Sequence, residues 1–332
     1  MTSDPVAADE RAAAEAWFAH HGLPWFVDEM REDVAARLTR TRVAVVATVA
    51  VVVGVGVGTA VSATPEPSFA AVAGITAAGL TLVGYSMAAL HATPIARWAL
   101  RRALGSLGLL LPLATRALPI LMLFITFLFI NTEVWQVASA LHGGVLWGAV
   151  LCFAGVAAFF LVPRLAQELD QFDDRVQIDE VLAGTANSPL ADAARRICED
   201  EVDLPDQAQV TGLQMVNLVL VLVIAQAVQV FLLVLAVFAF FLGFGALAID
   251  ESVITSWVGD GYPTYPPGPE LVSYELLHVS LFLAGFSGLY FTVVAITDEL
   301  YRKEFFTVIV DELARAVSMR VIYRMLADRR SP

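Results

Sequence analysis

Long uncharged apolar runs alternate with short charged segments along the whole of this chain. The longest run, Leu213–Ile249, holds 37 residues without a charge. About 20 apolar residues are enough to cross the hydrocarbon core of a bilayer, which is about 30 Å thick. A helix of this length would reach roughly 55 Å at about 1.5 Å per residue. We therefore predict that the run crosses a membrane once and either extends beyond one face or kinks near Gly243–Gly245.

The remaining apolar runs predict further membrane-spanning helices, so the fold class that we expect is an all-α, polytopic helical membrane protein. The period-two alternation of an outer-membrane barrel is absent. A third span is placed after Arg116, with an interfacial segment before it, because an arginine within the bilayer costs about 2.5–3.5 kcal/mol. Six spans result, at residues 43–61, 69–90, 117–137, 143–162, 213–249 and 271–296.

The positions of the basic residues predict the orientation of these spans. All 20 Lys and Arg residues fall within residues 1–42, 97–116, 163–211 and 297–332, and the other three connections contain none. Basic residues are retained on the cytoplasmic side of a membrane, which predicts that both termini are cytoplasmic. The expected organisation is a tail (1–42), four spans (43–162), an acidic loop (163–211), two spans (212–296) and an amphipathic helix (297–332).

The two cytoplasmic ends show helical patterns. In the tail, helices are expected over Pro5–His20 and Val27–Arg42, with the aromatic pairs Trp17–Phe18 and Trp25–Phe26 at the membrane interface, where amphipathic rings are favoured. The C-terminal stretch carries an apolar stripe at helical spacing. The stripe comprises Phe305, Phe306, Ile309, Leu313, Val317 and Val321.

Composition agrees with a membrane protein and excludes several other classes. The chain is 58% hydrophobic and only 16% charged, whereas ordinary globular domains are about 25% charged. Its net charge of −13 is not that of a nucleic-acid-binding protein. The 163–211 loop, with four basic and twelve acidic residues, would suit a cationic partner or metal ions, although a solvated hairpin is the simpler interpretation. Cys152 and Cys198 indicate neither a disulfide framework nor a thiolate metal site, and no cofactor or metal ligand set is predicted.

The most unusual segment is FLFINTEVWQ, residues 127–136, which places three polar side chains near the outer end of the third span. Glu133 and Gln136 share a helix face, with Asn131 nearby. A membrane carboxylate beside amides can carry a proton or hold a cation. The alternative is that Glu133 is solvated at the outer interface and Trp135 is an ordinary interfacial residue.

Two further pairs are candidates to line a pathway. Gln226 and Gln229 lie near the middle of the long run, three residues apart, and an amide in hydrocarbon needs a partner or water. Hydrogen bonding between helices is the simpler interpretation. Glu275 and His278 lie three apart at the outer start of the last span, where the carboxylate can tune the imidazole for proton exchange.

Small residues within the spans predict close approach of helices. Gly54 and Gly58 in the first span have the spacing of a GxxxG motif, and Gly144 and Gly148 repeat it in the fourth span. No P-loop lysine follows the first pair, so phosphate binding is not supported.

The FLFINTEVWQ segment and the run FLAGFSGLYF, residues 282–291, resemble segments of uncharacterised multi-pass membrane proteins of actinobacteria. The two runs cover a small part of the chain. The resemblance implies a location in the bacterial inner (plasma) membrane and implies no activity or site.

Two classes of function follow from these observations. The first is a transporter or channel for a small solute or ion, with Glu133, Gln136, Gln226, Gln229 and His278 lining the path. The second is a membrane scaffold or accessory subunit that forms homo-oligomers or docks a cytoplasmic protein through its loop and terminal helices. No catalytic constellation is present, and no nucleic acid is expected as a partner.

Overall fold

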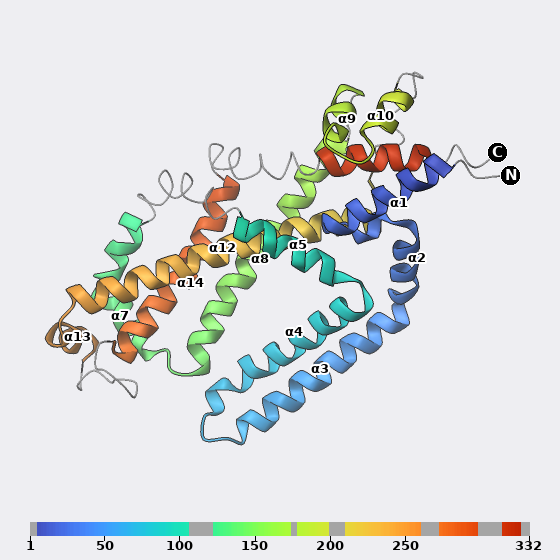
Figure 1. The fold of residues 1–332 in the computed structure, drawn as a ribbon. Helices are drawn as coiled ribbons and strands as arrows, with labels where there is room; N and C mark the ends of the chain where they lie inside the picture. The colour runs from blue at the N-terminus through green and yellow to red at the C-terminus, as the bar shows by residue number, and fades with distance from the viewer. Residues whose placement is uncertain are drawn as a thin grey trace.

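The computed structural model describes residues 5–105, 122–173, 178–198, 210–259, 272–297 and 314–326, and within these ranges the regular structure is helical throughout (Figure 1). Five helices are long and apolar enough to cross a membrane, or six if one bent pair counts as a span. Helices of this length and composition are compatible with an integral membrane protein that has several spans. Arg116 and most of the interfacial segment expected before it lie outside the described ranges.

The first two spans form a hairpin that projects from the rest of the molecule (Figure 1). Helix α3, Arg40–Ser62, turns through the short helix η2, Pro67–Phe69, into α4, Ala70–Ala89. The helices approach so closely at Gly54 that an added Cβ atom would lie 2.8 Å from the carbonyl oxygen of Gly74. The small residues predicted to bring helices together do so here, within the chain.

The other spans pack around α14, Tyr274–Thr297, which contacts both α8, Gly144–Asp173, and α12, Leu213–Ala248. Two glycines of α14 allow this packing. A Cβ atom on Gly288 would lie 2.6 Å from Val234 of α12, and one on Gly285 would lie 3.4 Å from Val150 of α8. Half of the span in α14 is consequently buried, which is the largest buried share among the five.

The structure moves one expected helix end and decides one open alternative. The helix of the fourth span does not end at Val162, because α8 continues through Pro163 to Asp173 and takes the first part of the expected loop into the helix. The part of α8 that is long and apolar enough to cross a membrane is Gly144–Leu165, close to the expected span. Proline removes one backbone hydrogen bond, which neighbouring groups can compensate in such helices. Helix α12 is continuous from Leu213 to Ala248, so Gly243 and Gly245 do not interrupt it.

The third expected span, residues 117–137, is broken rather than straight. Residues 122–129 form one helical segment and α7, Thr132–Ala140, forms another, with a bend of 75° between them. Asn131 causes the break locally: its extended backbone leaves the first helix, and its side chain caps the second. The expected continuous span is therefore corrected to a bent pair over the residues described.

The polar segments from the two ends and from the middle of the chain form one body, which we call the composite unit. Its members are α1 (Pro5–His20), η1 (Pro24–Phe26), α2 (Asp28–Arg37), α9 (Ile178–Thr185), α10 (Ala191–Cys198), the helical residues 314–326 and the first turns of α12. Figure 1 shows α1 and the helical residues 314–326 on the same side of the molecule as α9 and α10.

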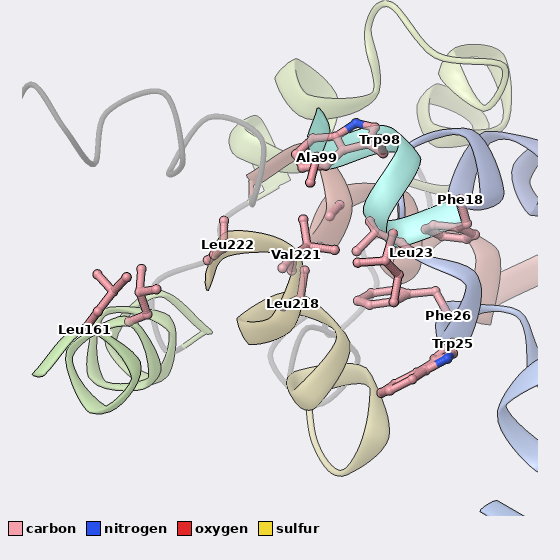
Figure 2. Packing of buried hydrophobic residues seen from close by; sticks show 14 of the residues in the cluster. Phe18, Leu23, Trp25, Phe26, Trp98, Ala99, Leu161, Leu218, Val221 and Leu222 are labelled. Carbon is pink, nitrogen blue, oxygen red and sulfur yellow. The ribbon is translucent and has the colours of Figure 1, made fainter. Parts of the chain in front are cut away.

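Three of the four aromatic residues of the N-terminal tail lie in the core of the composite unit, so their rings are not exposed as interfacial rings would be. Phe18, Trp25 and Phe26 are at most 3% exposed. Figure 2 shows them beside Leu218 and Val221 of α12 and Trp98 of α5, Ala92–Gly105. The expectation of an interfacial position was wrong for these three, because sequence alone does not reveal that the tail folds back onto α12.

The C-terminal helical residues are also enclosed. Val317 and Val321 of the predicted apolar stripe are fully buried, but so are Ser318 and Arg320 on other faces. The helix is therefore a core element of the composite unit over residues 316–323 and not a surface helix with one apolar face. The rest of the predicted stripe, up to Leu313, lies outside the described residues.

Candidate functional site

Asn131 has a structural role at the bend before α7. Its side-chain oxygen accepts hydrogen bonds from the backbone nitrogens of Glu133, at 2.9 Å, and Val134, at 3.2 Å. Trp135 is fully buried and donates from its indole nitrogen to the carbonyl oxygen of Phe129, at 2.6 Å. These bonds hold the two segments in their bent arrangement, so Trp135 is a core residue and not an interfacial one.

The other candidate polar residues near α7 have partly or fully exposed side chains. Glu133 and Gln136 are both exposed on α7. His278 on α14 is half-buried, and its ring lies 6.3 Å from the ring of His142. Glu275 lies one turn before His278 and is also half-buried. The structure thus gathers these residues near α7, and Glu133 is exposed there.

Gln226 and Gln229 occupy a different environment. Gln226 is 1% exposed, and its side-chain oxygen has no hydrogen-bond partner in the described part of the chain. Gln229 is partly exposed. A buried amide oxygen without a partner costs about 1–3 kcal/mol, so this position is unfavourable unless something supplies a donor.

The structure separates the two groups of candidate pathway residues along α12. Phe129, at the base of α7, stacks on Phe241 of α12 with ring centroids 4.7 Å apart. Gln226 lies fifteen residues before Phe241, which is about 22 Å along a helix. The residues near α7 and the glutamines of α12 therefore do not form a single compact site, and their role in a pathway stays a prediction.

A polar cluster joins the two ends of the chain within the composite unit. The Tyr323 hydroxyl donates to Glu15, at 2.9 Å, and accepts from the Arg11 guanidinium, at 3.0 Å. Arg11 also bonds Asp28 of α2, at 3.2 Å. Burial, reinforced by the hydrogen bond to Glu15, raises the pKa of the Tyr323 hydroxyl well above its usual range.

Helix α12 is fixed to this cluster by two amide side chains. Asn217 is fully buried; its oxygen accepts from the backbone nitrogen of Trp25 and its nitrogen donates to the carbonyl of Gly22, each at 3.0 Å. One turn earlier, the Gln214 oxygen accepts from the buried Arg320 guanidinium at 2.8 Å. The long apolar helix α12 therefore begins inside the composite unit and continues from there as a candidate membrane span.

The middle segment completes the composite unit through α9 and α10. An added Cβ atom on Gly184 of α9 would lie 2.4 Å from the Ser318 hydroxyl, so only glycine permits this approach. The Ser318 hydroxyl also reaches the carbonyl oxygen of Glu180, at 3.3 Å. Arg196 of α10 pairs with Glu10 of α1. Tail, loop and C-terminal helix therefore contact one another directly.

Sequence reasoning missed the residues that build this cluster, although part of the signal was present. Gln214 and Asn217 are amides at the start of an otherwise apolar run, with the same spacing as Gln226 and Gln229. Their partners Arg320, Trp25 and Gly22 are far away in the sequence. Only the fold shows that the first pair is satisfied by hydrogen bonds and that the oxygen of Gln226 is not.

Within the described ranges, no group of three or more His, Cys, Asp or Glu residues has a geometry that would hold a metal ion. No protein-family model, curated protein or solved structure matches this chain. The arrangement of the described residues is therefore the basis for any functional proposal.

Proposed function

We propose that this protein is a membrane scaffold or accessory subunit whose composite unit docks a soluble cytoplasmic protein. In this proposal the chain spans a bacterial plasma membrane six times with both termini inside. The bent pair of 122–129 and α7 is the third span. The resemblance of residues 127–136 and 282–291 to actinobacterial membrane proteins is the reason for choosing that membrane.

One observation carries the proposal: three polar segments, separated by spans, are built into one folded body. Tyr323 and Arg11 join the ends of the chain, and Gly184 and Arg196 attach the middle segment to them. Segments in contact must lie on the same side of a membrane. Together these segments of the sequence carry 16 of the 20 basic residues, which supports the cytoplasmic side.

A scaffold needs a folded body that presents a fixed surface on one side of the membrane. The composite unit buries large aromatic side chains and satisfies buried polar groups with long-range hydrogen bonds. A rigid body of this kind presents a preformed surface. A partner can then bind to it without a large loss of conformational entropy.

The test is co-purification after mild solubilisation, with a matched pair of glycine variants. Gly184→Val places a side chain against Ser318 and separates α9 from the C-terminal helix. Gly56→Val, in α3, meets no other atom within 4 Å and serves as the control. The proposal predicts a partner in constant ratio with the wild type and with Gly56→Val, and its loss with Gly184→Val. The same partner ratio in all three proteins, or no partner with any, would argue against a scaffold.

Transport is a second candidate, favoured by the unpartnered oxygen of Gln226. A water molecule or a passing solute can supply the missing donor. Single cysteines at 226 and 229, in a protein lacking Cys152 and Cys198, test this candidate with a membrane-impermeant thiol reagent applied to either side. Labelling at either position would support a water-filled pathway, whereas labelling only at an exposed control, Glu66→Cys in the turn between α3 and α4, would leave the glutamines as packing contacts.

A further inference from the structure

Helix α5 leaves the end of a span and carries an exposed basic face. Only Leu90 and His91 separate it from α4. Its inner face is formed by Ile95, Trp98 and Ala99, which are at most 9% exposed and belong to the buried hydrophobic cluster. Figure 2 shows Trp98 and Ala99 in this packing. The helix is thus fixed by contacts on one side, and the two-residue corner keeps its N-terminal end beside the end of α4.

The opposite face of α5 presents Arg97 and Arg101, which are exposed and lie one turn apart on the same side of the helix. Neither makes an ion pair with any residue in the described ranges. The helix itself contains no acidic residue. Leu100 lies between them and is 51% exposed. Two free guanidinium groups beside an exposed leucine are unusual in a chain with a net charge of −13.

Two more exposed arginines lie at the same end of the hairpin. Arg40 and Arg42 open α3, and the start of α3 is beside the end of α4, because the Tyr85 hydroxyl bonds the carbonyl oxygen of Arg37 at 3.1 Å. The only hydrogen bond that the structure gives for Arg42 is a long one, 3.4 Å, to the carbonyl of Ala36. Exposed basic groups therefore lie both at the start of α3 and on α5, the helix that follows the adjacent end of α4.

We propose that the exposed face of α5, formed by Arg97, Leu100 and Arg101, is a binding surface for the headgroups of anionic phospholipids. Guanidinium groups bind phosphate oxygens in bidentate geometry, and an exposed leucine gains by insertion beside the acyl chains. A protein partner with an acidic surface would satisfy the arginines but would not require their position at the end of a span. The surface is independent of partner docking by the composite unit.

Native mass spectrometry of the full-length protein, released from micelles with equal phosphatidylglycerol and phosphatidylcholine, measures this preference as a ratio of bound lipids. An arginine near an anionic membrane surface contributes roughly a fivefold preference, so Arg97→Gln with Arg101→Gln should lower the ratio by about 25-fold. The matched control is Arg195→Gln with Arg324→Gln, two exposed arginines of the composite unit. It removes the same charge away from the spans and should leave the ratio unchanged.

The proposal is overturned if the wild type shows no preference for phosphatidylglycerol, or if both double variants lower the ratio equally. It is also overturned if soluble glycerol phosphate competes as well as the lipid, because the surface would then bind a free phosphate ester. Circular dichroism of each variant checks that the helices are retained. Loss of helix in the Arg97 and Arg101 variant would contradict the assignment of these side chains as exposed and unpaired.

Discussion

The Tyr323 hydroxyl lies 2.9 Å from a carboxylate oxygen of Glu15, although 308 positions separate the two residues in the chain. This bond joins the two end segments of the chain, between which lie the helices that are long and apolar enough to cross a membrane. It is surrounded by Arg11 and Asp28, and the aromatic rings of Phe18 and Tyr323 meet edge to face with centroids 5.6 Å apart. The contact between Tyr323 and Glu15 shows directly that the polar segments at the two ends of the chain fold together.

Tyr323→Phe removes the bond to Glu15 and the bond from Arg11 while keeping the ring. We expect the thermal unfolding midpoint in detergent to fall, with a loss of free energy of unfolding of about 1 kcal/mol. Tyr274→Phe is the control, because the Tyr274 side chain is exposed on α14 and makes only a ring contact with His278. An equal effect of both substitutions would contradict the role of the Tyr323 hydroxyl.

The same residue predicts a pH dependence. The pKa of Tyr323 is raised in the folded protein above the unfolded value of about 10. A raised pKa means that the stabilising contribution is complete below about pH 10 and declines as the pH rises beyond it. Unfolding midpoints measured between pH 8 and pH 11 should therefore fall at the alkaline end in the wild type, and fall less in Tyr323→Phe. Identical slopes would show that other groups dominate.

Asn217 and Gln226 should respond in opposite ways to the same kind of substitution. Asn217→Leu leaves the backbone nitrogen of Trp25 and the carbonyl of Gly22 unpaired, which costs about 1–3 kcal/mol for each buried group. Gln226→Met removes an amide oxygen that already lacks a partner, so stability should be unchanged or increased. Thermal unfolding compares them directly, and a large destabilisation by Gln226→Met would reveal a partner for that side chain.

The close approach in the hairpin can be tested with two glycines of α3. Gly54→Val forces a side chain against the backbone of Gly74, whereas Gly56→Val enters open space. We expect Gly54→Val to reduce hydrogen-exchange protection in both α3 and α4, and Gly56→Val to leave it intact. Similar exchange in the two variants would mean that the helices do not meet at Gly54 in the membrane.

The bend before α7 depends on the helix cap formed by Asn131 and on the indole hydrogen bond of Trp135. Asn131→Ala removes two accepted hydrogen bonds at the start of the helix, a loss of about 0.5–2 kcal/mol. Trp135→Phe keeps an aromatic ring against Phe129 but loses the bond to the Phe129 carbonyl. Both should lower the unfolding midpoint more than Gln136→Ala, whose side chain is exposed. A Gln136 effect of equal size would point to a functional contact at that residue.

The spans could be predicted from sequence because their signal is local. Apolar length alone placed α3, α4, α12 and α14 within a few residues of their observed bounds. The break at Asn131 was missed because, in the sequence, an asparagine that caps a helix within an apolar run cannot be distinguished from a polar residue of a functional site. The continuation of α8 through Pro163 was missed because proline usually ends a helix in water.

The composite unit could not be predicted in the same way. Phe18, Trp25 and Phe26 look like interfacial aromatics until the tail is seen to pack on α12. From the sequence, Arg320 would be taken for a surface residue, but the structure buries it and bonds it to Gln214. These contacts join residues that are more than a hundred positions apart, and no local pattern encodes them. Residue type alone likewise does not show whether a glutamine lines a pathway. The side-chain oxygen of Gln214 accepts a hydrogen bond from Arg320, whereas that of Gln226 has no partner among the described residues.

The contact between the N-terminal tail and the middle segment offers the most direct test of the central claim that the composite unit exists. In a protein lacking Cys152 and Cys198, Glu10→Cys and Arg196→Cys are introduced together, with a protease site in the turn at residues 63–66. Membranes are treated with a short bismaleimide and then cleaved. The account predicts that the two fragments stay joined on a denaturing gel, whereas those of the control pair Glu10→Cys and Glu133→Cys separate. Separation of the first pair, with each single cysteine still reacting with a monomaleimide, would contradict the account.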